Sequence, residues 1–206
     1  MNRRLTAVAL ALTALALTGC ISLFPKADPA QLYRFEAPPP SQLLPPGPLF
    51  GVLRLSSGFP RAASGDRILT VNTSGEAAYI AGARWVSPAS VLFEEQVGTA
   101  FQSGGRARLI GRGEVIKADY SLKLDVQTFE TYYDQGPKAA PVVVISVRGL
   151  ITRNRDRALM GDQLFTARVR AGDNRVSAIV PAYNQALSQV LGKLVVWVNA
   201  LDTSAG

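Results

Sequence analysis

The chain has 206 residues, among which are 22 Lys and Arg, 15 Asp and Glu, one Cys and no His. Without His, the sequence holds neither a Ser/His/Asp nor a Cys/His catalytic pair and no His-ligated metal site. A single Cys cannot close an intramolecular disulfide or supply the thiolates of an iron–sulfur or structural zinc site. These counts exclude the common hydrolases and zinc enzymes, and we expect no metal and no cofactor.

The first residues have the pattern of an export signal. Arg3 and Arg4 form a basic start, and residues 5–17 form an uncharged stretch rich in Ala and Leu. This stretch is too short for a helix that spans a bilayer, which needs about 20 apolar residues. We therefore expect residues 1–19 to be a signal peptide.

The end of this signal resembles the lipobox of bacterial lipoproteins, with Leu17, Thr18, Gly19 and Cys20 in its four positions. Cleavage between Gly19 and Cys20 would make Cys20 the first mature residue and leave its thiol to carry diacylglycerol. The alternative is an ordinary signal peptide with an incidental Cys. The lipobox is favoured because the only Cys of the chain stands where the motif requires it. Several acyl chains would anchor the protein stably in a membrane without spanning it.

The rest of the chain divides into a tethering segment and one folded domain. Residues 20–48 are expected to form the lipid-anchored segment, with a short strand at 31–35 and a spacer in which residues 37–48 contain six of the 13 prolines. Residues 49–206 have the length of a single domain. The formal net charge of +7 suits nucleic acid or anionic lipid. Export makes nucleic acid implausible, so we expect no nucleic-acid partner.

Periodicity predicts the elements of the domain. Ser87 and Pro88 are a good helix start, and Gly104 and Gly105 end that helix. A second helix is predicted at about 177–201, where apolar residues recur at intervals of three and four. Alternation, β-branched residues and turn formers predict strands at 49–55, 67–71, 77–80, 120–127, 142–151 and 164–170. The fold class is therefore α+β: a two-layer sandwich of an antiparallel sheet with two amphipathic helices on one face.

Several of these features together resemble the ABC-type transport auxiliary lipoproteins. The lipobox is followed by the strand Tyr33-Arg34-Phe35, by the proline-rich gap, and by the run from Tyr79 through Arg84 and Trp85 to Pro88 before the first helix. Members of this family include the lipoprotein of the paraquat-inducible operon and auxiliary components of MCE-type lipid transporters. The resemblance covers nearly all of the mature chain.

The resemblance implies a non-enzymatic, periplasm-facing component of an ABC/MCE-type envelope system that moves phospholipid or another hydrophobic substrate. Its partners would be an MCE-domain protein, an ABC permease and an ATPase. Whether the chain also forms a homo-oligomer is left open. Ile21 after the lipobox, where enteric bacteria use Asp to retain lipoproteins in the inner membrane, favours the outer membrane. The alternative is an envelope lipoprotein that activates peptidoglycan synthesis or supports outer-membrane assembly.

Candidate sites in the domain are contact residues, because no spacing suggests a catalytic group. Arg84 and Trp85 invite a lipid or partner contact, although a core Trp85 with a solvated Arg84 is the favoured interpretation. Tyr132 and Tyr133 lie near a hairpin tip and either contact a partner or pack at the sheet end. Two basic clusters, which face either anionic lipid or water, comprise Arg106, Arg108 and Arg112 and the turn residues Arg153, Arg155 and Arg157.

Overall fold

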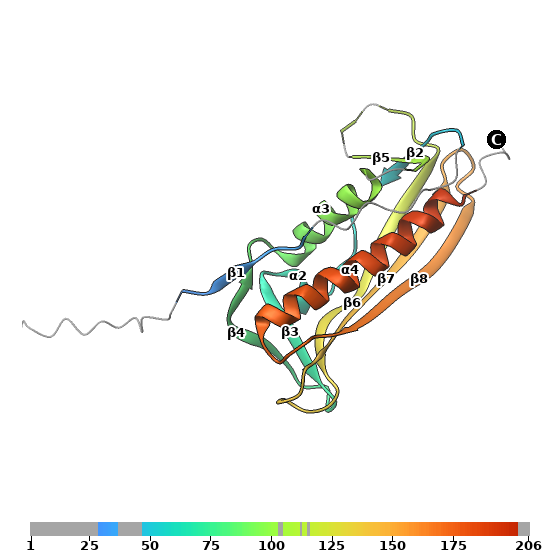
Figure 1. The fold of residues 1–206 in the computed structure, drawn as a ribbon. Helices are drawn as coiled ribbons and strands as arrows, with labels where there is room; N and C mark the ends of the chain where they lie inside the picture. Colours follow the sequence, from blue (N-terminus) through green and yellow to red (C-terminus); the bar gives the residue numbers. More distant parts are fainter. Residues whose placement is uncertain (1–28, 37–46, 103–104, 112, 115, 202–206) are drawn as a thin grey trace, which may run out of the picture.

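In the computed structural model, eight strands form one sheet with three helices among the described residues, which are 29–36, 47–102, 105–111, 113–114 and 116–201 (Figure 1). The predicted signal peptide, Gly19, Cys20 and most of the proline-rich spacer lie outside them. The strands are β1 (Gln31–Tyr33), β2 (Phe50–Arg54), β3 (Arg67–Asn72), β4 (Ala77–Trp85), β5 (Ala107–Ile110), β6 (Tyr120–Tyr133), β7 (Val142–Arg153) and β8 (Leu159–Arg170). The helices are α2 (Arg61–Ser64), α3 (Ala89–Gln102) and α4 (Val176–Asn199).

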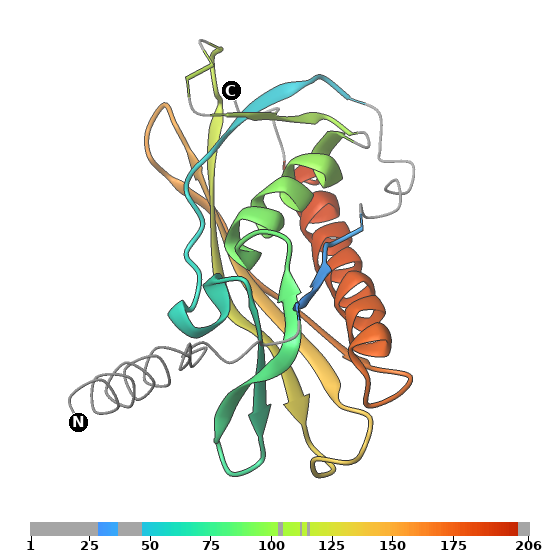
Figure 2. The same ribbon diagram turned by 90° about the vertical axis from the view of Figure 1, so that its left-hand side faces the viewer.

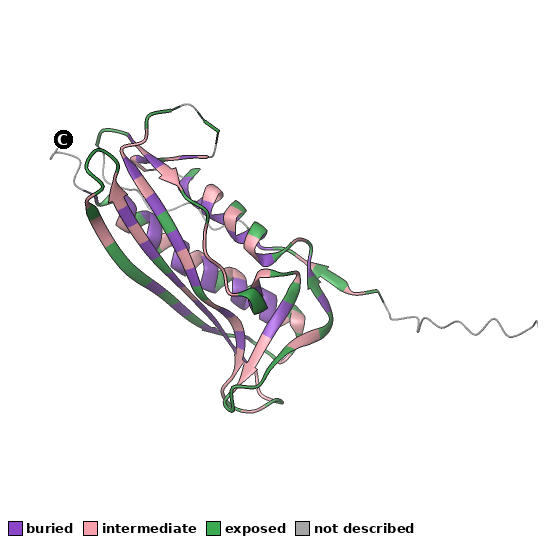
Figure 3. Ribbon diagram, turned by 180° about the vertical axis from the view of Figure 1, so that it is seen from behind, coloured by how far each residue is buried: buried purple, intermediate pink, exposed green. Residues whose placement is uncertain are grey.

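The long antiparallel meander β6–β7–β8 is the centre of the sheet. Its strands have 14, 12 and 12 residues. Neighbours pair from Tyr120 with Arg153 to Tyr132 with Val142, and from Val142 with Arg170 to Thr152 with Leu159. Alternate residues are buried along most of β6 and in the second half of β8, where they are Phe165, Ala167 and Val169, as the stripes in Figure 3 show. The alternation predicted at 120–127 and 164–170 is therefore confirmed, and the strands themselves are longer than expected.

The remaining strands correct the prediction of an antiparallel sheet. Only β3 and β4 form a hairpin there, whereas β2 and β3 both run parallel to β6, β5 runs parallel to β2, and β1 runs parallel to β4. The cause is the link from β2 to β3, which continues along β6 as residues 55–60 and turns through α2. Because the chain does not reverse between them, β2 and β3 meet the same edge of β6 at its two ends. The α+β class is confirmed, and the sheet is mixed.

The two long helices lie side by side on one face of this sheet (Figure 2). Helix α3 begins directly after Pro88, whose carbonyl accepts hydrogen bonds from the amides of Val91 and Leu92. Helix α4 packs against β7 and β8, and Tyr183, Leu187, Val190 and Leu194 along its predicted stripe are all buried. The stripe is therefore the core face of one helix rather than the seam of a coiled coil.

Candidate functional site

Trp85 belongs to the core. It ends β4 with 2% of its surface exposed, and its ring meets Phe35 and Tyr183 edge-on at centroid distances of 4.7 and 5.2 Å. Its neighbour Arg84 points the other way, since successive strand residues face opposite sides, and forms an exposed ion pair with Asp66 at 2.9 Å. The structure therefore supports the packing interpretation and leaves the indole out of reach of a partner.

Tyr132 and Tyr133 lie at the end of β6 and are half-buried. The hydroxyl of Tyr133 donates a hydrogen bond of 2.8 Å to Oδ1 of Asn174, and burial raises the pKa of Tyr133. The Arg168 guanidinium lies 5.8 Å from the ring centroid of Tyr132. Phe129, four residues before Tyr133 on the same strand, is buried. These residues tie the sheet end to the turn before α4, which is the packing role weighed against partner contact.

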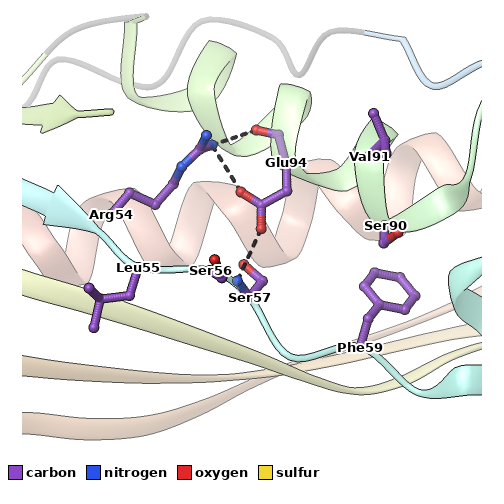
Figure 4. A pocket seen from close by; sticks show the side chains of 8 residues that line it. All are labelled: Arg54, Leu55, Ser56, Ser57, Phe59, Ser90, Val91 and Glu94. Carbon is purple, nitrogen blue, oxygen red and sulfur yellow. Dashed lines mark hydrogen bonds and ion pairs between the residues drawn. The ribbon is translucent and has the colours of Figure 1, made fainter. Parts of the chain in front are cut away.

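A groove between α3 and residues 55–60 was not predicted from the sequence. It has a volume of about 400 Å³ and is drawn in Figure 4. Nη1 of Arg54 donates to the backbone carbonyl of Glu94 at 2.8 Å and lies 3.2 Å from its Oε2. Oε1 of Glu94 accepts a hydrogen bond of 3.3 Å from the amide of Ser57. The side chains that line the rest of the groove are Leu55, Ser56, Phe59, Ser90 and Val91.

The Glu94 side chain connects the two walls of this groove by contacting Arg54 and the Ser57 amide, and we call these three residues the clasp. The Glu94 carboxylate is engaged by a guanidinium and an amide, so it is not placed to act as a general base. The hydroxyl of Ser57 is buried without a hydrogen-bond partner and has no imidazole or amine beside it to activate it. Across the described part of the chain, no three acidic, Cys or His side chains gather where a metal ion could bind. The clasp joins the β2–β3 link to α3.

A larger cavity, of about 610 Å³, lies at the start of β2 and at one end of the sheet. Residues 48–50, 117–120 and 153–155 line it, and we call the segments to which they belong, 47–50, 116–120 and 153–159, the basic end. Arg153 donates to both carboxylate oxygens of Asp156, and this hydrogen bonding lowers the pKa of Asp156 to about 2. Asp119 accepts a hydrogen bond of 3.0 Å from the amide of Gly51. Arg112 of the predicted cluster lies outside the described residues.

Comparison with known proteins decides the family. A family model described as the ABC-type transport auxiliary lipoprotein component matches residues 35–195. The chain belongs to this family. The match extends from Phe35 into α4 and includes both the clasp and the basic end. The family resemblance seen in the sequence is confirmed, and membership implies a lipid-anchored location in the cell envelope and association with an ABC transport system.

Solved structures show that the fold of this auxiliary lipoprotein recurs. A Xanthomonas campestris protein from the family DUF330 has a TM-score of 0.72 at 24% identity, over 82% of this chain and 95% of its own. An uncharacterized protein has a TM-score of 0.64 at 14% identity, over 83% and 99%. A hypothetical Chlamydia trachomatis protein has a TM-score of 0.51 at 12% identity, over 76% and 99%. No curated protein matches the chain in sequence.

Although α4 has 24 residues, no helix in the described ranges combines the length and hydropathy needed to cross a bilayer.

Proposed function

We propose that this auxiliary lipoprotein is a non-enzymatic scaffold of an envelope transport system that moves phospholipid or another hydrophobic substrate. The observation that carries the proposal is the family match over residues 35–195 in a chain whose only Cys stands in a lipobox. In this proposal an MCE-domain protein, an ABC permease and an ATPase are the partners. The protein itself transports nothing and hydrolyses nothing.

The lipid anchor sets where the scaffold works. Cys20 carries the acyl chains, and the absence of Asp at position 21 favours the outer membrane. Fully extended, the residues from Cys20 to Pro29 reach at most about 30 Å. The body of the protein therefore stays close to the anchoring membrane while it contacts a partner.

A non-enzymatic role agrees with the chemistry of the described cavities. The carboxylates of Glu94 and Asp156 are held by arginines, and Asp119 bonds a backbone amide. These interactions stabilise the fold, and they occupy the carboxylates that would have to be available to a substrate in an acid–base mechanism.

Purification from native envelopes tests the proposal. A tagged full-length copy, extracted in mild detergent, is expected to recover an MCE-domain protein with its permease and ATPase, identified by mass spectrometry. The matched control is Cys20→Ala, which removes the lipid-bearing thiol and is expected to reduce the recovery. Recovery of a peptidoglycan synthase or an outer-membrane assembly machine, without any transport component, would contradict the proposal.

A further inference from the structure

The basic end carries protruding aliphatic side chains. Of the four large aliphatic side chains in the described ranges that are at least 60% exposed, three are here: Leu49 at 62%, Ile116 at 63% and Leu159 at 60%. They come from three separate segments, which lie before β2, between β5 and β6, and at the start of β8. Exposed apolar side chains that gather at one place mark a contact surface, whereas single scattered ones do not.

The same end has more cations than carboxylates. Its described cations are Lys117, Arg153, Arg155 and Arg157, and its described carboxylates are Asp119 and Asp156. Asp156 forms ion pairs with two of these cations, Arg153 at 2.7 Å and Arg155 at 3.9 Å. The surface therefore keeps a positive excess and complements an anionic partner.

The opposite end of the sheet lacks this combination. There Arg170 pairs with Asp134 at 2.6 Å, and Arg175 pairs with Asp173 at 3.1 Å. Lys138 is exposed on the β6–β7 turn of that end and supplies a matched control for a cation of the basic end.

The exposed groups of the basic end favour a membrane as the partner. Phe50 and Tyr120 meet edge-on at 5.5 Å and are 6% and 5% exposed, so their rings belong to the core. The exposed groups are therefore large aliphatic side chains, Arg and Lys, and Lys is depleted at protein interfaces. Cations beside apolar side chains that enter the headgroup region are the means by which peripheral proteins bind anionic bilayers.

We propose that the basic end binds the surface of a bilayer containing anionic phospholipid, with Leu49, Ile116 and Leu159 entering the headgroup region and the cations contacting phosphates. This contact is additional to the lipid anchor. The first described strand, β1, lies at the far side of the molecule from the β7–β8 turn (Figure 1). Two separated attachments fix the orientation of the body, which a tether alone leaves free.

Arg157 gives a variant that separates binding from folding. It is the only described non-glycine residue with a positive φ, 60°, a conformation that carries an energetic cost for residues other than Gly. Arg157→Gly relieves this cost while it removes a cation. The variant is therefore expected to keep or raise thermal stability and to weaken membrane binding.

Cosedimentation with vesicles tests the proposal on the mature chain carrying Cys20→Ala, so that no acyl chain contributes. Binding to an equimolar mixture of phosphatidylglycerol and phosphatidylcholine is expected to exceed binding to phosphatidylcholine alone and to fall as salt rises. Arg157→Gly and Lys117→Ala are each expected to lower the partition coefficient about fivefold. Ile116→Ser and Leu159→Ser are expected to lower it severalfold, and the controls Lys138→Ala and Leu164→Ser are expected to leave it unchanged.

Two results would overturn the proposal. One is equal binding to the two kinds of vesicle, or equal losses in the control variants. The other is unchanged vesicle binding by Arg157→Gly and Lys117→Ala together with reduced recovery of a transport component from native envelopes, which would make the basic end a protein-docking surface. The vesicle assay contains no transport component, so its failure is distinct from failure of the proposed function.

Discussion

Gly161 of β8 lies under the indole of Trp197 of α4, and a Cβ at position 161 would stand 2.6 Å from Cζ2 of that ring. Gly149 of β7 lies beneath the same indole, where a Cβ would stand 3.0 Å from Cζ3. Phe165 holds the ring from the side at a centroid distance of 5.4 Å. The absence of two side chains from the sheet thus lets the end of α4 approach it.

Gly161→Ala is therefore expected to destabilise the protein by about 1–3 kcal/mol, because the added methyl group overpacks the contact with Trp197. Urea unfolding, followed by circular dichroism, measures the change. Gly172→Ala is the control, since no atom lies within 4 Å of the Cβ it would introduce. In a Trp197→Leu background the cost of Gly161→Ala should shrink; an unchanged cost there would show that the indole is not the obstacle.

Substitutions at Trp85 and Arg84 distinguish packing from contact. Trp85→Ala removes a buried ring that meets Phe35 and Tyr183 and is expected to cost about 3–5 kcal/mol. Arg84→Ala breaks only an exposed ion pair and is expected to cost less than about 1 kcal/mol. Thermal and urea unfolding of both variants check this difference. A stable Trp85→Ala protein would refute the core assignment.

Periodicity predicts which residues face the core but does not identify strand partners. The alternation along Tyr120–Tyr133 and the apolar stripe of α4 depend on local geometry, so they can be predicted from the sequence. Parallel pairing of β2 and β3 with β6 depends on the path of residues 55–60, which contain no repeating pattern. Strand β5 has only four residues, too few for an alternation to be recognised.

The clasp was missed, and the basic end was identified only in part, for a similar reason. Arg54 and Glu94 are 40 residues apart, and nothing in their local sequence signals that they form an ion pair. In Arg84-Trp85, by contrast, the position at the end of a strand already favours one buried and one solvated side chain. The arginines of the β7–β8 turn are visible in the sequence, but their approach to Leu49 and Lys117 requires the fold.

Acid is expected to weaken the fold through Asp156. The folded-state pKa of Asp156, about 2, lies below the pKa near 4 that it has in an unfolded chain. Its interaction with Arg153 therefore stabilises the protein fully at pH values above about 4. This contribution is lost as pH falls from about 4 to 2. Carboxyl chemical shifts measured by NMR across this range should give the low pKa, and Arg153→Ala should raise it toward 4. A pKa near 4 in the unsubstituted protein would contradict the Arg153 contact.

The end of α4 is attached to β5 by Asn199, whose side chain is fully buried. Its Oδ1 accepts hydrogen bonds from the amides of Arg106 and Ala107, and its Nδ2 donates to the carbonyl of Val195.

Asn199→Ala is therefore expected to cost about 2–4 kcal/mol, because it leaves buried backbone groups without partners. Hydrogen exchange measured by mass spectrometry should show that the substitution accelerates exchange in β5, relative to the unsubstituted protein, more than in the distant β7. The matched control is Asn184→Ala, which removes an exposed acceptor for the Glu36 amide and is expected to change stability by less than about 1 kcal/mol. Equal effects of the two substitutions would show that Asn199 does not hold β5 in place.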